Sequence, residues 1–412
     1  MLSFWFKIPL WQRVIGALIL GVAAGFAWGP EAETIKWIGD FFIKAIKMLV
    51  VPLIFFSLVS GVAAIGDLRK LGKVGGRALI LFIVTGQIAA WLGLFLGTII
   101  KPGAGLRTDL IEKGDTPVPK ETSAVDMILS IVPDSPVQVM ADARVLPLIV
   151  FALLIGIGIL MAKEDGKPLI KIFDSGAVVM QKVTMIVMEL TPFGVFALMA
   201  WVAGTLGIEA LQALGWLVFL NYLGCLLIIG VMYSAMLRFI GKVPVIDFFR
   251  GIVDAIAVSY STASSNATLP VTLRCTQRNL GVSKSVSSFV ISLGATINMN
   301  GTAMYLGLAT LFGAQIFGVD LTWGDYLLIS ILSTLGAIGA AGIPGAGLIM
   351  MALVFGAVGV PLETIALVAG VDRIMDMMRT TTNVSGDAAV AVTVAAMTGE
   401  LDKEELISAD DV

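Results

Sequence analysis

Long apolar stretches that contain few or no charged side chains recur along most of this sequence. A helix needs about 20 apolar residues to cross the roughly 30 Å hydrocarbon core of a membrane. Stretches of this kind lie near residues 14–29, 45–66, 78–100, 145–162, 172–205 and 211–237. Charged residues make up only 14% of the 412 residues, whereas a soluble domain has about 25%. A large soluble core does not explain apolar runs along nearly the whole chain, so the sequence predicts an all-α integral membrane protein.

The distribution of Lys and Arg predicts how these helices are oriented. Membrane helices are expected at about 11–29, 41–66, 76–100, 144–162, 168–203 and 210–238. Basic residues gather in the segments 66–77, 162–171, 237–242 and 273–284. Segments 204–213 and 317–325 contain neither Lys nor Arg. Because basic loops stay in the cytoplasm, both termini are predicted to be cytoplasmic. The stretch 101–126 is expected on the external side, although it contains four basic residues.

Two pairs of glycines have the spacing that lets helix backbones approach closely. They are Gly21-x-x-x-Gly25 and Gly93-x-x-x-Gly97, and small residues four apart favour close packing of membrane helices. Chance occurrence in a glycine-rich membrane protein is the alternative interpretation.

The second half of the chain contains hydrophobic segments that are interrupted. Residues 326–362 carry no charge and have "GAIGAAGIPGAG" (336–347) at their centre. Two full crossings need about 40 residues and a turn, so two half-length helices joined in a re-entrant hairpin are predicted. "SYSTASSNATLP" (259–270) and "GATINMNGTAMY" (294–305) interrupt other apolar segments. Irregular backbone at membrane depth must be buried in protein or line a cavity, and paired interruptions indicate a transporter's binding site. Ordinary loops outside the membrane are the alternative.

A polar stripe runs along the helix predicted near the C-terminus. At about 100° per residue, its members fall within roughly an 80° arc. They are Asp372, Asp376, Arg379, Asn383 and Asp387. A single charge at the bilayer centre is costly, so these side chains need partners. Internal pairing of Arg379 with Asp376, one turn away, is one solution, and a bound cation that offsets the surplus acid is another.

The stripe also has the chemistry to bind an acidic amino acid. The planar guanidinium of Arg379 suits a carboxylate held by two hydrogen bonds. Asp376, at a similar depth, can accept hydrogen bonds from an ammonium group. The α-carboxylate would then find hydroxyls and backbone N–H groups at an interrupted segment, such as Ser264 and Ser265. Asp387, beside a glycine, is suited to bind a hard cation, which prefers oxygen ligands.

Several functional classes receive no support from the sequence. There are no histidines, and the two cysteines, Cys225 and Cys275, have no metal-ligand spacing. No basic run or motif indicates nucleic-acid binding. No cofactor is expected other than a coupling ion, and a membrane enzyme is disfavoured because no activated nucleophile is evident.

Taken together, four motifs resemble those of the glutamate transporter family, the dicarboxylate/amino acid:cation symporters, in a form similar to the prokaryotic members. The motifs are "SSNATLP" (264–270), "GATINMNGT" (294–302), "GAAGIPGAG" (339–347) and "DMMRTTTNVSGD" (376–387). They occur in the family's order, and the resemblance covers essentially the whole chain. It implies eight transmembrane helices, two opposed re-entrant hairpins built as inverted repeats, a homotrimer and an elevator mechanism.

The resemblance also implies a division of the chain into a scaffold and a moving transport domain. The scaffold would comprise 1–75 and 126–205, and the transport domain 76–125 and 206–412. Within the latter, the implied elements are hairpin 1 at about 244–278, a broken helix 7 at 286–316, hairpin 2 at 323–358, helix 8 at 362–398 and a cytoplasmic tail.

The resemblance assigns three sets of site residues. The implied substrate contacts are Ser265, Thr302, Ile343, Gly347, Asp376, Arg379, Thr380 and Asn383, with Ser264 beside them. One implied sodium site comprises Gly294, Asn298, Asn383 and Asp387, and a second comprises backbone oxygens of Thr296, Ala337, Ile338 and Ala340. A third cation site would comprise Phe82, Thr85, Gly86 and Asn300.

The third cation site departs from the family's pattern. The family's "NMDGT" is "NMNGT" here, so Asn300 replaces an aspartate, and Phe82 and Gly86 replace a tyrosine and a serine. Losing a carboxylate and two hydroxyls weakens a hard-cation site, so this site is expected to be weak or absent. The family's proton-carrying glutamate corresponds to about Leu306, which cannot titrate. No role is assigned to Arg373.

The sequence therefore predicts a symporter for L-aspartate and L-glutamate in the cell membrane, with sodium as the favoured coupling ion. Proton coupling and C4-dicarboxylate substrates are the alternatives within the same class. An ion channel is the alternative from another class.

Overall fold

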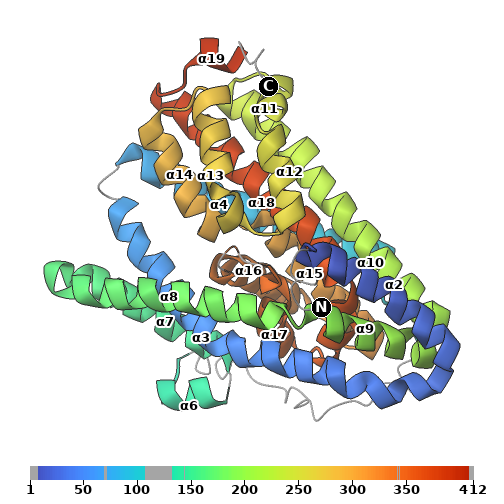
Figure 1. Cartoon of the computed structure of the whole chain (residues 1–412). Coiled ribbons are helices and arrows are strands. Elements are labelled where there is room, and N and C mark those ends of the chain that lie inside the picture. Colours follow the sequence, from blue (N-terminus) through green and yellow to red (C-terminus); the bar gives the residue numbers. More distant parts are fainter. Residues whose placement is uncertain are drawn as a thin grey trace.

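The computed structural model describes residues 8–68, 72–106, 132–142, 144–340, 342 and 344–407. These residues form helices joined by short turns, and one antiparallel bridge connects Val282 and Leu401 (Figure 1). The predicted all-α class is confirmed. Most of the predicted loop 101–126 and the last residues of the predicted tail lie outside the described ranges.

The first half of the chain forms most of the long apolar helices. Its elements are α2 (Leu10–Trp28), η1 (Gly29–Ile35), α3 (Lys36–Leu68), α4 (Lys73–Ile100), α6 (Pro136–Ala141), α7 (Val145–Met161), η2 (Lys163–Gly166), α8 (Lys167–Met188), α9 (Thr191–Trp201), η3 (Val202–Leu206), α10 (Gly207–Leu227), η4 (Ile228–Tyr233) and η5 (Met236–Gly241). Helices lie at all six predicted places. The prediction of one helix over 168–203 is wrong at its centre, because α8 ends at Met188 and a new helix begins at Thr191. Pro192 lacks the N–H that a continuous helix would use there.

In the part of the chain that the structure describes, four helical stretches are long and apolar enough to cross a membrane, by length and composition. They are Leu10–Ala63, Lys73–Ile100, Pro147–Met188 and Thr191–Gly241. Three of them, with 54, 42 and 51 residues, have more than twice the roughly 20 residues that one crossing needs. These stretches agree with a helical membrane protein.

The second half contains the interrupted helices. Its elements are α11 (Val245–Gly251), α12 (Val253–Thr262), α13 (Ser265–Arg274), η6 (Cys275–Asn279), α14 (Lys284–Ile297), α15 (Asn300–Phe317), α16 (Trp323–Gly339), α17 (Ala346–Val358), α18 (Glu363–Thr398) and α19 (Lys403–Ile407). The structure interrupts the helices at all three predicted places: after Thr262, after Ile297 and after Gly339. Ala263, at the first interruption, has a φ of 50°, which a non-glycine residue adopts only at a local cost.

Helix α18 runs through the interior of the molecule (Figure 1, red). From Leu367 to Ala395 every residue except Ile374 is buried, and α18 packs against α10, α12, α14, α15, α4 and α9. Threonine and asparagine are weak helix formers. The hydroxyls of Thr381 and Thr382 donate to carbonyls four residues earlier, each over 3.0 Å, so their polar groups are satisfied within the helix.

The helices fall into two groups by their contacts. In the first, α3 packs against α7, α8 and α9, and α2 packs against α9. In the second, α4 packs against α15 and α16, while α16 packs against α17. Helix α17 also touches α3 and α7, so the two groups are in contact with each other.

Both glycine pairs lie at close helix contacts, as one of the two interpretations expected. A Cβ on Gly97 would lie 2.9 Å from the Leu311 side chain of α15. A Cβ on Gly25 would lie 2.8 Å from the Cβ of Ala203. A Cβ on Gly93 would overlap the Met304 carbonyl oxygen and lie 2.8 Å from its carbonyl carbon. The packing of α4 on α15 therefore requires glycine at position 93.

We predict that Gly93→Ala destabilises the protein because α4 must move away from α15. Overpacking of this kind costs about 1–3 kcal/mol. Gly158→Ala is the matched control, since a Cβ at position 158 of α7 would meet nothing within 4 Å and alanine favours helix by up to about 1 kcal/mol. Thermal unfolding of both variants in detergent measures the difference. Equal midpoints for the two variants would show that this contact does not depend on glycine.

Candidate binding site along α18

Two of the helix interruptions meet beside α18. The Ser264 hydroxyl donates to the Gly342 carbonyl over 3.0 Å, and the Asn266 N–H donates to the same oxygen over 3.3 Å. Gly342 has a φ of +61°, and an added Cβ would lie 3.3 Å from the Asn266 side chain. Ser264 also caps α13, because its hydroxyl accepts the Ala267 N–H. The segment between α12 and α13 therefore touches the segment between α16 and α17.

Hydrogen bonds join both segments to α18. The Gly345 N–H donates to the Asp376 carboxylate over 2.9 Å. The Arg373 guanidinium donates to the Thr262 carbonyl over 3.1 Å. Gly345 has a φ of +75°, a conformation that favours glycine. The polar stripe of α18 is thus covered by the two interruptions.

Arg379 is the central side chain of this region. Its Nη1 lies 2.9 Å from Oδ1 of Asp372, and its Nη2 lies 2.8 Å from Oδ1 of Asp376. The side chain has no exposed surface, and its Cζ lies 3.7 Å from the ring centroid of Tyr305. A Cβ on Gly347 would lie 3.0 Å from that Cζ. The internal pairing that the sequence left open is therefore present, with two carboxylates instead of one.

Tyr305 and Arg373 complete the charged cluster. The Tyr305 hydroxyl donates to Oδ1 of Asp372 over 2.8 Å, and Nη1 of Arg373 lies 3.9 Å from Oδ2 of Asp376. Two carboxylates thus face two guanidiniums. Buried charges are tolerated when they are paired and hydrogen-bonded, so this balance explains how the cluster can lie inside the molecule.

A second polar group surrounds Asp387. Its carboxylate accepts a hydrogen bond from the Asn298 amide over 3.0 Å. Gly294 leaves room for this carboxylate, since an added Cβ would overlap it. The Oδ1 of Asn298 is buried without a hydrogen-bond partner. The three predicted sodium ligands Gly294, Asn298 and Asp387 are therefore adjacent.

The fourth predicted ligand, Asn383, has its own contacts on α15. Its Oδ1 accepts the Gly301 N–H over 2.8 Å, and its Nδ2 lies 3.4 Å from the Thr302 hydroxyl. Nδ2 also lies 3.2 Å from the sulfur of Met299. In the described ranges, no three His, Cys, Asp or Glu side chains gather as they would in a carboxylate-rich metal centre. Amide and backbone oxygens make up most of the predicted sodium ligands, and these are the atoms that remain to coordinate an ion.

Residues of the other two predicted cation sites line one small cavity between α4, α15 and α16. The cavity, about 10 Å³ in volume, is bordered by Phe82, Gly86, Asn300, Ala337 and Ile338, among others. Of the remaining predicted ligands, Thr296 donates its hydroxyl to the Leu293 carbonyl, and Ala340 donates its N–H to the Ala337 carbonyl.

Asn300 uses its amide as a donor within this group. Its Nδ2 lies 3.1 Å from the Thr85 hydroxyl and 2.8 Å from the Tyr233 hydroxyl. Tyr233 in turn donates to the Thr382 carbonyl over 3.1 Å. The position where the family has a carboxylate is therefore part of a neutral hydrogen-bond chain.

The remaining predicted substrate residues are placed as follows. Ser265 is the first residue of α13 and is buried, and Thr380 is buried on α18 beside Arg379. Ile343 lies outside the described residues. The sequence prediction missed Tyr305 and Tyr233. Tyr305 lies one helical turn after Thr302, within the motif "GATINMNGTAMY", and this position could have indicated a place in the site. Nothing in the sequence around Tyr233 indicates its role.

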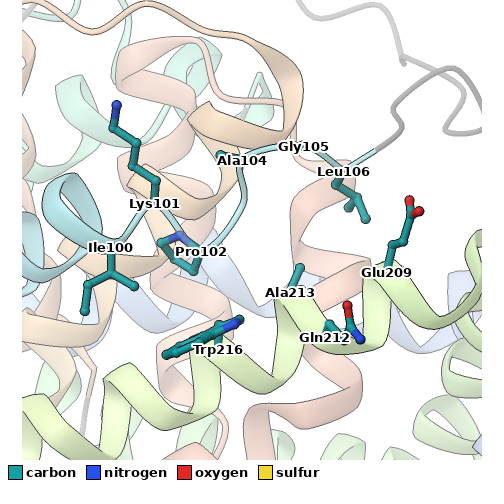
Figure 2. A pocket seen from close by; sticks show the side chains of 10 residues that line it. All are labelled: Ile100, Lys101, Pro102, Ala104, Gly105, Leu106, Glu209, Gln212, Ala213 and Trp216. Atoms are coloured by element: carbon teal, nitrogen blue, oxygen red, sulfur yellow. The ribbon is translucent and has the colours of Figure 1, made fainter.

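A larger surface cavity lies away from these groups. It has a volume of about 420 Å³ and is lined by the last residue of α4, the segment that follows α4 and the first part of α10, as Figure 2 shows. Glu209 and Gln212 face it from α10, while Lys101 extends away from Glu209 (Figure 2). None of the predicted site residues that the structure describes lines this cavity.

Comparison with known proteins agrees with the sequence motifs. A model of the sodium:dicarboxylate symporter family matches residues 10–397. The chain is 35% identical to the proton/sodium-glutamate symport protein of Geobacillus stearothermophilus, over 97% of each chain. It is 36% identical to the C4-dicarboxylate transport protein of Bacillus subtilis, over 96% of this chain and 95% of that one. It is 35% identical to the proton/sodium-glutamate symport protein of Bacillus subtilis, over 95% of this chain and 94% of that one.

We predict that Tyr305→Phe destabilises the protein by about 1–3 kcal/mol, because the buried Asp372 carboxylate loses a hydrogen-bond donor. The phenylalanine ring still covers Arg379, so the variant isolates the hydroxyl. Tyr260→Phe is the control: this tyrosine is 38% exposed and its hydroxyl lies 3.0 Å from that of Tyr222, so a change within about 0.5 kcal/mol is expected. Chemical or thermal unfolding in detergent compares them. A Tyr305→Phe midpoint equal to the wild-type value would contradict the proposed contribution of this hydrogen bond.

Proposed function

The chain belongs to the sodium:dicarboxylate symporter family, and on that premise we propose that it is a cation-driven symporter for L-aspartate and L-glutamate. The family consists of membrane transporters and not of enzymes. The observation that carries the proposal is the complete burial of Arg379 between two carboxylates, at the point where both helix interruptions reach α18. A guanidinium in this position can exchange an internal carboxylate for one on the substrate.

The exchange would proceed between groups of matching chemistry. Arg379 would turn from Asp376 to the side-chain carboxylate of the substrate, where its two N–H groups can bind both oxygens. Asp376 would then accept hydrogen bonds from the substrate's ammonium group. Thr380, Asn383 and Thr302 would supply polar contacts next to it. The α-carboxylate would bind Ser265 and the backbone around Gly342 and Gly347, after the Ser264–Gly342 contact opens.

Charge balance explains why a cation must accompany the substrate. The cluster of two carboxylates and two guanidiniums is neutral, and an acidic amino acid adds one net negative charge. In a medium of low dielectric constant an uncompensated charge is costly. One cation near Asp387 would offset that carboxylate, so a second cation, at the site of backbone oxygens, would balance the substrate and favour its binding. The substrate would favour cation binding by the same free energy.

Sodium is the coupling ion that we propose, with two of the family's three sites. Asp387, Asn298 and the carbonyl oxygens of Gly294 and Asn383 form one site, and backbone oxygens of Thr296, Ala337, Ile338 and Ala340 form the other. The third site is weak, because Asn300 donates N–H groups to Thr85 and Tyr233 where a cation would need oxygen atoms.

The same resemblance suggests the larger assembly. We propose eight membrane crossings, two re-entrant hairpins at α12–α13 and α16–α17, and cytoplasmic termini. The scaffold, 1–75 and 126–205, would hold a homotrimer while 76–125 and 206–412 move as an elevator. The two groups of helix contacts in the fold support this division, since α3 packs on α7–α9 and α4 packs on α15.

Proton coupling and C4-dicarboxylate transport are the second candidate. They are supported by the names of relatives that match this chain equally well. Uptake of labelled aspartate and succinate into proteoliposomes, under separately imposed sodium and proton gradients, tests the two candidates. Aspartate uptake driven by sodium supports the first candidate, whereas proton-driven uptake, or uptake of succinate without aspartate, supports the second.

We predict that Arg379→Cys lowers aspartate uptake at least about a hundredfold. Removing one partner of a buried ion pair costs about 3–5 kcal/mol, and each 1.4 kcal/mol corresponds to about tenfold in binding. Arg274→Cys is the control, because Arg274 forms an ion pair with Asp254 in which its side chain is 53% exposed. Both variants are checked for an unchanged elution volume. Aspartate uptake that survives Arg379→Cys would refute the assigned role of this guanidinium.

We predict that the triple change Asn300→Asp, Phe82→Tyr and Gly86→Ser steepens the sodium dependence of aspartate uptake. It restores a carboxylate and two hydroxyls to the third cation site. A Cβ on Gly86 would lie 3.2 Å from a Thr334 methyl carbon and 3.6 Å from Oδ1 of Asn300, so a serine fits tightly. The Hill coefficient for sodium should rise by up to about one, while Phe82→Tyr alone leaves it unchanged. An unchanged coefficient in the triple variant would show that these residues do not form a cation site.

A further inference from the structure

We propose that Arg373 sets the substrate range of this transporter because its guanidinium, in addition to that of Arg379, neutralises the Asp376 carboxylate. With this partner present, the site accepts dicarboxylates that lack an amino group as well as acidic amino acids. The inference rests on the proposed function, because it concerns the same site.

Arg373 lies within the charged cluster although it is only 7% exposed. Its Nη2 donates to the Thr262 carbonyl over 3.1 Å, and its Nη1 lies 3.9 Å from Oδ2 of Asp376. Its Nε is buried without a hydrogen-bond partner. The guanidinium is therefore held in place by one carbonyl and keeps donor capacity for a carboxylate.

The contacts of the two carboxylates show that Arg373 serves one of them. Asp372 has Arg379 and the Tyr305 hydroxyl as partners. Asp376 has Arg379 on one oxygen, and the Gly345 N–H and Arg373 on the other. Of the two carboxylates, Asp376 is the one that lies within ion-pair distance of Arg373. When Arg379 turns from Asp376 to a substrate, Asp376 still has the guanidinium of Arg373 as its partner.

This retained partner changes which substrates are tolerated. If Arg373 were absent, a dicarboxylate without an amino group would leave Asp376 buried and unpaired, which is strongly unfavourable. An acidic amino acid would not, because its ammonium supplies the missing positive charge. Arg373 removes this difference. The Arg373 guanidinium also repels the incoming ammonium group. Both effects favour dicarboxylates that lack an amino group.

The Arg373 side chain borders a small cavity of about 10 Å³, which Gly345, Leu348 and Asp372 also border and Asp376 does not. Its Nη1 lies 3.9 Å from Oδ2 of Asp376, an ion-pair separation that is longer than a direct hydrogen bond. The Thr262 carbonyl, at the end of α12, anchors the other edge of the guanidinium.

The test uses uptake of labelled L-aspartate and labelled succinate by the full-length protein in proteoliposomes. Arg373→Met removes the charge and keeps a similar length, whereas Arg373→Lys keeps the charge. The wild type should transport both substrates. Arg373→Met should lower kcat/KM for succinate at least about tenfold relative to aspartate, and Arg373→Lys should restore most of the succinate uptake. Arg274→Met, which removes an exposed arginine, should leave the ratio unchanged.

Each alternative outcome has a distinct meaning. If the role of Arg373 is only to join α18 to α12 through its hydrogen bond to Thr262, Arg373→Met lowers uptake of both substrates by the same factor, and the proposal is overturned. A wild type that transports aspartate and not succinate overturns it as well, while the proposed function stands. A wild type that transports neither substrate overturns the proposed function itself. If Arg373→Met does not fold, the succinate-to-aspartate ratio of Arg373→Gln decides in the same way.

Discussion

The burial of one guanidinium determines how the rest of this structure is arranged. Taking a charge out of water costs several kcal/mol even after the protein relaxes. Arg379 is fully buried, and two carboxylates, a tyrosine ring and the space left by Gly347 accommodate it. The residues that supply these contacts come from α18, α15 and α17. The interrupted helices therefore have to converge on the middle of α18, and the long apolar helices surround that convergence.

Much of this arrangement could be predicted from the sequence, because membrane helices require long uncharged stretches and polar stripes require partners. The helix interruptions near Ser264, Asn298 and Gly342 were predicted from glycine, proline and asparagine within apolar runs. The ion pair of Arg379 with Asp376 follows from helical spacing. The second pair, with Asp372, could not be predicted, since the two residues are seven apart in the sequence and the pair forms because the long Arg379 side chain reaches along the helix. Tyr233 reaches Asn300 from another helix, and a single sequence does not show such contacts.

The exchange of internal for external partners links specificity with ion coupling. The cluster on α18 is neutral, so every net charge that a substrate brings must be balanced by an ion. In the proposed mechanism, the contacts at Asn300 would reduce the number of sites available for that ion, whereas the contacts at Asp387 would preserve one. The proposed role of Arg373 extends the same reasoning to the substrate, because this guanidinium would determine whether an amino group is required. Substrate choice and cation number are thus two results of one charge balance.

The most direct test is a cryo-EM structure of the protein with L-aspartate and sodium. The account predicts ligand density between α18 and the two helix interruptions, with the Arg379 guanidinium bound to the ligand's side-chain carboxylate and separated from Asp376. A map in which Arg379 keeps both of its ion pairs while the ligand binds elsewhere would contradict the account.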